Sequence, residues 1–185
     1  MDDIDKITFQ LLEAISAAVG NQLTQLTDET TQETFPAVLE SYQEAARPDF
    51  PFITVSTLNI RDAEGFLTET YNDENGVSEV AVDRLITYRV YCWGANTTPI
   101  LNTLKTALHM DYFKQIIKVG KARLYDLKDV KEVPKITGAD DFNKNSYLDL
   151  TLSYRSTFTF DQGYFDHYNA EGDIEGEQID IVIQP

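Results

Sequence analysis

Residues 146–160 constrain the fold of this chain more than any other stretch. Side chains alternate between the two faces of an extended backbone, and here they separate into an apolar and a mostly polar set. At about 3.3 Å per residue the stretch spans roughly 45 Å, longer than an ordinary strand. We therefore expect it to form the spine of a sheet. The apolar set is Leu148, Leu150, Leu152, Tyr154, Phe158 and Phe160.

The composition indicates a folded protein that belongs to a reducing compartment. Of the 185 residues, 42% are hydrophobic and 11% aromatic, which argues against global disorder. The single cysteine, Cys92, excludes an internal disulfide framework. No apolar run reaches the roughly 18 residues of a membrane helix, and the N-terminus is acidic where a signal peptide is basic. We expect a cytoplasmic protein that does not bind membranes.

The net charge limits the classes of partner. Fifteen Lys and Arg against 31 Asp and Glu leave a formal charge of −16. A protein that wraps a nucleic acid needs cations to neutralise phosphates, so specific or tight nucleic-acid binding is not expected. An acidic surface is compatible with simple solubility, with a channel through which DNA slides, or with a protein that imitates DNA.

Helical periodicity predicts two helical regions. Apolar residues from Ile4 to Val19 recur at helical spacing and predict a helix over residues 3–19. A second begins near Thr97 or Thr98, either of which is a suitable N-cap, with Pro99 in its first turn. Its apolar stripe continues to Gly120 after an expected break at Asp111.

The remaining pattern predicts strands around the long one. We expect strands at about residues 52–60, 85–93, 122–128 and 178–184, a surface loop at 21–36, and a hairpin arm at 61–83 that reverses at Asn75-Gly76. The composition of residues 171–177 predicts an acidic, flexible turn. The expected fold is α+β: a mixed, mainly antiparallel sheet packed by two or three helices, with an extended hairpin arm, in a single domain spanning 1–185. Apolar residues on both faces of 85–93 place that strand inside the sheet.

Residues that could carry chemistry are sparse. His109 and His167 are the only histidines, and neither stands near Cys92 in the sequence, so a cysteine–histidine nucleophile is not indicated. The run from Glu171 to Gly176 resembles the start of a calcium-binding loop, but Val182 occupies the position of the essential bidentate glutamate. The sequence therefore predicts no catalytic residue, no cofactor and no metal.

Several distinctive segments follow one another along the chain. They are the N-terminal amphipathic helix, Gln43 with the segment Arg47-Pro48-Asp49-Phe50-Pro51-Phe52-Ile53-Thr54-Val55, the strand ending Tyr91-Cys92-Trp93-Gly94 with its helix, and residues 148–154. In this order they resemble the phage neck or tail terminator (tail-completion) family. Entry into a strand through Arg-Pro-x-x-Pro-aromatic is the most specific of these.

The resemblance implies a structural virion protein without enzymatic activity. Such a protein forms a homohexameric ring that caps the tail tube, ends its polymerisation and joins the tail to the head connector. Its implied partners are copies of itself, tail tube and sheath proteins, and head connector or stopper proteins, with genomic DNA passing through the lumen unbound. The implied location is the neck of the virion, after assembly in the host cytoplasm.

Two extended segments are candidates for contact with a neighbouring subunit, because they are expected to be joined to the core by flexible connections. They are the arm, with Phe66 and Tyr71, and the C-terminal strand, with Ile181. Pro48 and Pro51 fix an extended entry to the sheet beside Arg47. Arg47 either holds a carboxylate of a loop or a neighbour, or is a surface arginine beside a rigid turn.

Two other functions compete with this interpretation. The charge of −16 is also expected of an acidic DNA mimic that inhibits a host nucleic-acid-binding protein. The second is a carbohydrate-active enzyme. Its two catalytic carboxylates could be far apart in the chain and would then form no recognisable sequence motif, although such an enzyme would need a deep cleft.

Overall fold

The computed structural model describes residues 3–28, 30–41, 47–72, 77–133, 145–161, 168–174 and 177–183; side chains are described within these ranges except at 64–72, 77 and from 160 onward. It is α+β, as predicted, with helices packed on a mostly antiparallel mixed sheet. The chain forms two compact units, one of residues 1–66 and 82–156 and the other of residues 67–81 and 157–185. The expectation of a single domain stays a prediction.

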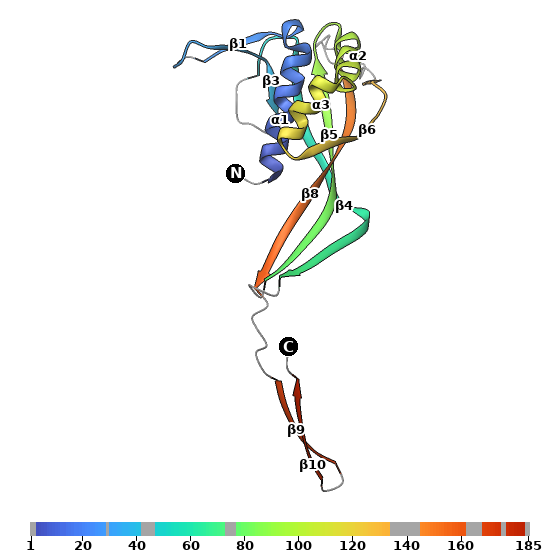
Figure 1. The fold of residues 1–185 in the computed structure, drawn as a ribbon. Coiled ribbons are helices and arrows are strands. Elements are labelled where there is room, and N and C mark those ends of the chain that lie inside the picture. The colour runs from blue at the N-terminus through green and yellow to red at the C-terminus, as the bar shows by residue number, and fades with distance from the viewer. Residues whose placement is uncertain are drawn as a thin grey trace. The chain divides into compact units, whose positions relative to one another are not determined.

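The helices of the first unit lie where the apolar periodicity placed them. Helix α1 spans Asp3–Val19, α2 spans Thr97–Leu108 and α3 spans Asp111–Val119, so the expected break at Asp111 is confirmed. Helix α1 contacts both α2 and α3 (Figure 1). The short 3-10 helix η1, Gly20–Gln22, ends the first helical region.

The N-cap of α2 differs from the prediction. Asn96, with φ of 57°, precedes the helix, and no side chain caps it. Thr97 and Thr98 lie inside the first turn instead, and each hydroxyl forms a 2.9 Å hydrogen bond with the hydroxyl of Ser146. The threonines therefore connect the start of α2 to the sheet, which a local capping rule could not anticipate.

Among the described residues, the main sheet has six strands. Their order is β3 (Val38–Glu40), β4 (Phe52–Asn72), β5 (Val77–Trp93), β8 (Asn145–Asp161) and β6 (Ala122–Leu127), with β7 (Lys131–Glu132) also beside β8. Strand β5 is interior, as predicted. Strand β3 runs parallel to β4, whereas β6 and β7 run antiparallel to β8.

Strands β4 and β5 are longer than the sequence indicated. Each runs unbroken through the region expected to be a separate arm, so the flexible connections expected near residues 61 and 83 are wrong. The predicted reversal at residues 73–76 lies outside the described residues. Continuous hydrogen-bonded strands explain the difference, since pairing across the sheet overrides the weak apolar character of residues 61–83.

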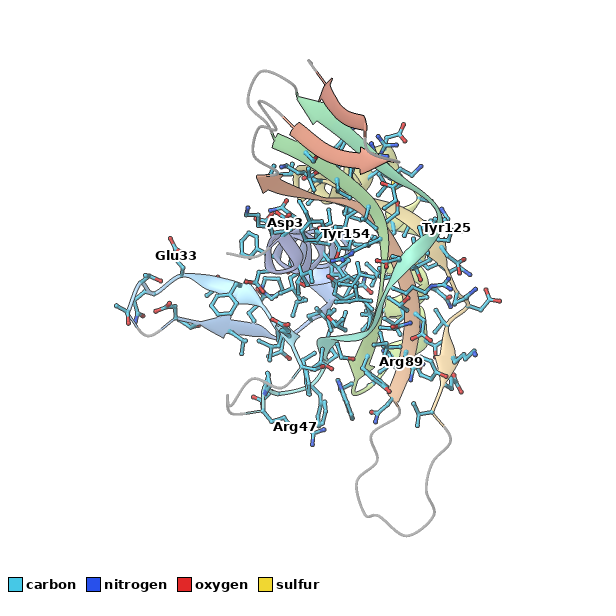
Figure 2. The ribbon with its side chains drawn as sticks, turned by 90° about the horizontal axis from the view of Figure 1, so that it is seen from below. Asp3, Glu33, Arg47, Arg89, Tyr125 and Tyr154 are labelled. Atoms are coloured by element: carbon cyan, nitrogen blue, oxygen red, sulfur yellow. The ribbon has the colours of Figure 1, made fainter. Side chains whose placement is uncertain are left out.

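Residues 21–36 also contain structure that the sequence did not predict. Strands β1 (Gln25–Thr27) and β2 (Thr34–Pro36) form a short antiparallel hairpin. Near its tip the Asp28 carboxylate accepts hydrogen bonds from the N–H groups of Thr30 and Thr31, at 2.7 and 3.0 Å. Figure 2 shows Glu33 near the far end of this hairpin.

The second unit contains an antiparallel hairpin of β9 (Tyr168–Ile174) and β10 (Glu177–Ile183). The predicted C-terminal strand is confirmed. Residues 171–174, expected to be a flexible turn, instead belong to β9, and the reversal falls at 175–176, outside the described residues.

The core lies between the three helices and one face of the sheet. Residues of α1, α2 and α3 pack with alternate positions of β5 and β8, and all of them are at most 5% exposed. Of the predicted apolar face of β8, residues 148 to 154 are buried, whereas Phe158 is 39% exposed and Phe160 lies outside the described side chains. The buried strand positions are Ile86, Tyr88, Val90, Cys92, Leu148, Leu150, Leu152 and Tyr154.

Candidate subunit interface

The opposite face of β5 and β8 carries half-buried polar and aromatic side chains. Thr87 contacts Thr151 through their hydroxyls at 3.1 Å. Toward one end of the strands, Tyr91 lies beside Tyr147 with ring centroids 5.7 Å apart. Residue numbers rise along β5 as they fall along β8, which is the arrangement of an antiparallel pair. These cross-strand contacts form a ladder on the side of the sheet away from the helical core.

A charged pair stands in the middle of this ladder. Arg89 donates two hydrogen bonds to Asp149, and its side chain is 28% exposed against 20% for the aspartate. The hydrogen bonds to Asp149 raise the pKa of Arg89 above its usual value. Its guanidinium also lies 4.4 Å from the centroid of Tyr147. The pair is therefore fixed on both sides, by a carboxylate and by an aromatic ring.

Aromatic rings continue the ladder to the entry of the sheet. Tyr91 lies 5.8 Å from Trp93, Trp93 stacks on Phe52 at 6.0 Å, and Phe52 stacks on Phe50 at 5.5 Å. The indole N–H of Trp93 donates to the hydroxyl of Thr54 at 3.0 Å. Strands β4, β5 and β8 and the segment that precedes β4 thus contribute to one array of rings. We call Arg47, Phe50, Phe52, Tyr91, Trp93, Tyr147 and Arg89 the arginine–aromatic strip.

Arg47 occupies the exposed end of this strip (Figure 2). Its guanidinium lies 4.6 Å from the ring centroid of Phe50, 5.6 Å from Phe52 and 5.7 Å from Trp93. Within the described part of the chain it forms no ion pair. Arg47 thus stacks on rings and presents its charge at the surface beside a rigid turn. A contact of this arginine with a carboxylate of a neighbouring subunit stays a prediction.

The two prolines hold the same segment. Pro51 follows a cis peptide bond from Phe50, and its carbonyl accepts the N–H of Thr24 at 2.9 Å. Pro48 is half-buried in the same entry segment. Gly94, with φ of 114°, lies against this entry, where a Cβ would stand 2.9 Å from the Cβ of Phe50. The end of β5 and the entry to β4 are therefore in close contact.

The other three candidate residues are placed only by their backbone. Phe66 and Tyr71 lie on β4, and Ile181 lies on β10 opposite Ala170. Their side chains, and any contacts that these side chains make, lie outside the described residues. Any role in an interface stays a prediction.

Most of the strip cannot be recognised as a unit in the sequence. Phe50, Phe52, Tyr91, Trp93 and Tyr147 are visible there only as parts of strands or motifs. A signal was present, since Arg89 and Asp149 are charged residues in the middle of two strands whose neighbours are apolar or aromatic. Which residue pairs with which depends on strand order, and the sequence pattern does not contain that information.

Chemistry at the remaining candidates is limited. Cys92 is buried on the core face, and burial raises the pKa of its thiol to about 12. His109 follows the last turn of α2 at the surface, and His167 lies outside the described residues. Among the described residues, no group of three or more His, Cys, Asp or Glu is arranged to hold a metal. None of the helices in the described part of the chain could cross a membrane.

Comparison with known families decides how this surface is interpreted. The family described as phage neck terminator protein matches residues 10–179. The chain belongs to the phage neck terminator family. The match covers the second half of α1, both other helices, the strip and most of the second unit. A comparison with curated proteins gives no match.

Membership confirms the resemblance inferred from the sequence. A neck terminator is a structural component of the virion, located in the tail and neck, and it contacts other head and tail proteins. The family is structural, in agreement with the prediction that the chain is not an enzyme. A face of stacked rings and arginines is well suited to such contacts, because aromatic residues and arginine are enriched at the centres of protein interfaces.

Proposed function

We propose that this neck terminator forms a homohexameric ring that caps the tail tube, ends its polymerisation and joins the tail to the head connector. The observation that carries the proposal is the arginine–aromatic strip, which runs along the sheet face away from the core and ends at the exposed Phe50 and Arg47. Tail tube and sheath proteins, and connector or stopper proteins, are the partners of its two ring faces.

The exposed parts of the sheet support association between copies. Leu58 and Ile60 of β4 are 47% and 41% exposed, which leaves apolar surface beside the strip. A ring closes when identical head-to-tail interfaces rotate through a full circle. The charge of −16 is compatible with a lumen that repels DNA and lets it slide without binding. Family membership favours this role over that of an acidic DNA mimic.

The mass of the purified protein in solution tests the ring directly. Light scattering and sedimentation velocity, with negative-stain images, should show six copies of the 21.0 kDa chain in a ring, either alone or after addition of tail tubes. Tubes grown in the presence of the protein should also stop at defined lengths. A chain that stays monomeric in both conditions contradicts the proposal.

Arg47→Ala tests whether the strip contributes to assembly. We expect association to weaken about tenfold, since the interface loses a stacked cation, while the free energy of unfolding changes by less than about 1 kcal/mol. Lys6→Ala is the matched control because Lys6 is also an exposed cation but lies on α1, outside both the strip and the arm. Equal behaviour of the two variants would remove Arg47 from the interface.

A further inference from the structure

Positive charge is concentrated in one part of this acidic chain. Residues 105–131 hold seven of the 15 Lys and Arg but only three of the 31 Asp and Glu. This segment therefore carries a net charge of +4, and the rest of the chain carries −20. It comprises the last turn of α2, all of α3 and strand β6, which belong to the first unit.

Three cations of this segment line a groove at the edge of the sheet, together with the carboxylate of Asp126, which pairs with Lys128. Helix α3 and strand β6 lie side by side (Figure 1), and a cavity of about 600 Å³ lies between them. His109, Lys114, Lys118, Arg123 and Tyr125 line it. Among the described strands, β6 pairs only with β8, so its other edge faces the groove. An unpaired strand edge offers N–H and C=O groups to an added strand.

Some of the cations that line the groove have no ion-pair partner among the described residues and could bind the carboxylates of another chain. Lys114 pairs with Asp111 at 3.6 Å across one helical turn. Lys118 and Arg123 are exposed and form no ion pair within the described part of the chain. A bulge in the pairing of β6 lies at Tyr125, which is 65% exposed (Figure 2).

Exposed apolar side chains also occur on α3 and directly before it. Met110, which precedes the helix, is 56% exposed, and Tyr112 and Val119 on the helix are 65% and 73% exposed. A helix that carries both large exposed apolar residues and the exposed cation Lys118 suits a partner with both apolar and acidic groups.

The C-terminal hairpin of this chain has that composition. Residues 168–183 contain five Asp and Glu and no Lys or Arg. In register, Ile179, Ile181 and Ile183 stand opposite Gly172, Ala170 and Tyr168, so one set of positions is apolar. The alternate set contains Glu171 directly opposite Asp180. Like charges in directly opposed positions destabilise a hairpin, and an isolated two-stranded hairpin is only marginally stable in water.

We infer that the groove between α3 and β6 of one copy binds the C-terminal hairpin of a neighbouring copy. This inference rests on the proposed ring, and it names the two surfaces of one head-to-tail contact. Lys118 and Arg123 neutralise the opposed carboxylates Glu171 and Asp180, and the exposed apolar residues of α3 cover the isoleucine positions. The free edge of β6 supplies backbone hydrogen bonds to the incoming strand.

Charge complementarity favours a second copy over a nucleic acid. A phosphate backbone approaching the groove would also meet the −20 charge of the rest of the chain. A hairpin with a charge of −5 fits the groove locally and carries its own apolar positions. Repetition of the contact around a ring uses every groove and every hairpin once, which is the requirement of a closed heterologous interface.

Charge reversal in the full-length chain tests the inference. Lys118→Glu with Arg123→Glu should weaken self-association at least tenfold, measured by sedimentation velocity at low salt, because the groove then repels the hairpin. Glu171→Lys with Asp180→Lys should have the same effect. Matched controls with equal charge changes are Lys6→Glu with Arg61→Glu, and Glu13→Lys with Glu33→Lys, all at exposed positions away from the groove.

Mixing the two reversed proteins makes the test specific for contact between copies. An equimolar mixture should regain association, since each reversed hairpin then meets a reversed groove and each original hairpin an original groove. Circular dichroism should show that the folds are retained, and the regained complex should weaken again as salt is raised.

Four outcomes would overturn the inference. If the original chain assembles and the reversed variants assemble equally well, the groove is not the contact, although the proposed ring stands. If the mixture fails to regain association, the two surfaces do not meet between copies. If groove reversal instead abolishes binding of a 30-bp DNA duplex, the groove serves phosphates. An original chain that never self-associates, with or without tail tubes, rejects the ring and the inference together.

Discussion

Arg89 on β5 holds Asp149 on β8 through two hydrogen bonds, 2.6 Å from Nε to Oδ1 and 2.8 Å from Nη2 to Oδ2. The two residues are 60 positions apart in the sequence. This parallel two-bond geometry is typical of a specific arginine–carboxylate pair and is compatible with only one register of the two strands. It also places the guanidinium over Tyr147, so the pair anchors one end of the arginine–aromatic strip.

Arg89→Ala should therefore cost stability. The substitution leaves the carboxylate of Asp149, only 20% exposed, without its partner, and we expect the free energy of unfolding to fall by about 2 kcal/mol. Urea denaturation monitored by circular dichroism measures the loss. Arg155→Ala is the control, because the Arg155–Asp83 pair has similar geometry but is 60% and 49% exposed, so solvent screens it and its loss should cost less than the loss of Arg89. Equal losses would contradict this account.

A buried hydroxyl pair should couple α1 to the sheet. Thr8 and Tyr88 are 2.9 Å apart, and Thr8 also donates to the carbonyl of Ile4 at 3.0 Å. Thr8→Val leaves the buried Tyr88 hydroxyl without this partner and should cost about 1–2 kcal/mol. Tyr88→Phe should cost less, since Thr8 keeps its bond to Ile4. The double variant should lose less than the two single losses combined; simple additivity in a double-mutant cycle would show that the hydroxyls are not coupled.

Alkaline pH should destabilise the fold through Cys92. Burial raises the pKa of this thiol from its ordinary value of 9.0 to about 12. Between these values the unfolded chain loses the proton while the folded chain retains it, so the free energy of unfolding should fall as pH rises from 9 to 12.

The control for this pH effect is Cys92→Ala, in which the free energy of unfolding should fall less steeply between pH 9 and 12. Tyr88 contributes to the remaining slope above pH 10, because burial raises the pKa of its hydroxyl from 10.0 to about 12. Denaturant titrations at several pH values on the original chain, Cys92→Ala and Tyr88→Phe separate the contribution of the thiol from that of the tyrosine hydroxyl. A slope unchanged in Cys92→Ala would show that the thiol does not contribute.

Gly94→Ala should disturb the arginine–aromatic strip. The backbone φ of 114° is strained for an L side chain, and the added Cβ would stand 2.9 Å from Phe50 and 3.2 Å from Pro51. We expect a loss of about 1–3 kcal/mol and a change in the fluorescence of Trp93, the one tryptophan of the chain, as its stack on Phe52 shifts. Ala95→Gly, at an exposed neighbouring position, should leave the emission of Trp93 unchanged. An unaltered spectrum in Gly94→Ala would contradict the close contact.

The sequence by itself was sufficient for the elements whose signal is local. Helix α1, the break at Asp111 and the burial of alternate residues in β8 follow from patterns within a few turns or one strand. The family resemblance follows from the order of several such segments. Local periodicity reflects backbone geometry, since helical and extended chains repeat their faces every 3.6 and 2 residues. The polar residues of β8 were correctly assigned to the face away from the core, without any indication of their partners.

Tertiary structure alone decided which side chains meet. The pairing of Arg89 with Asp149, the stacking of Arg47 on Phe50, and the groove between α3 and β6 join residues from different elements. These contacts depend on strand order and register, which are set by the burial and hydrogen bonding of the whole sheet. For the same reason the arm is continuous with β4 and β5, and Thr97 bonds to β8 instead of capping its own helix.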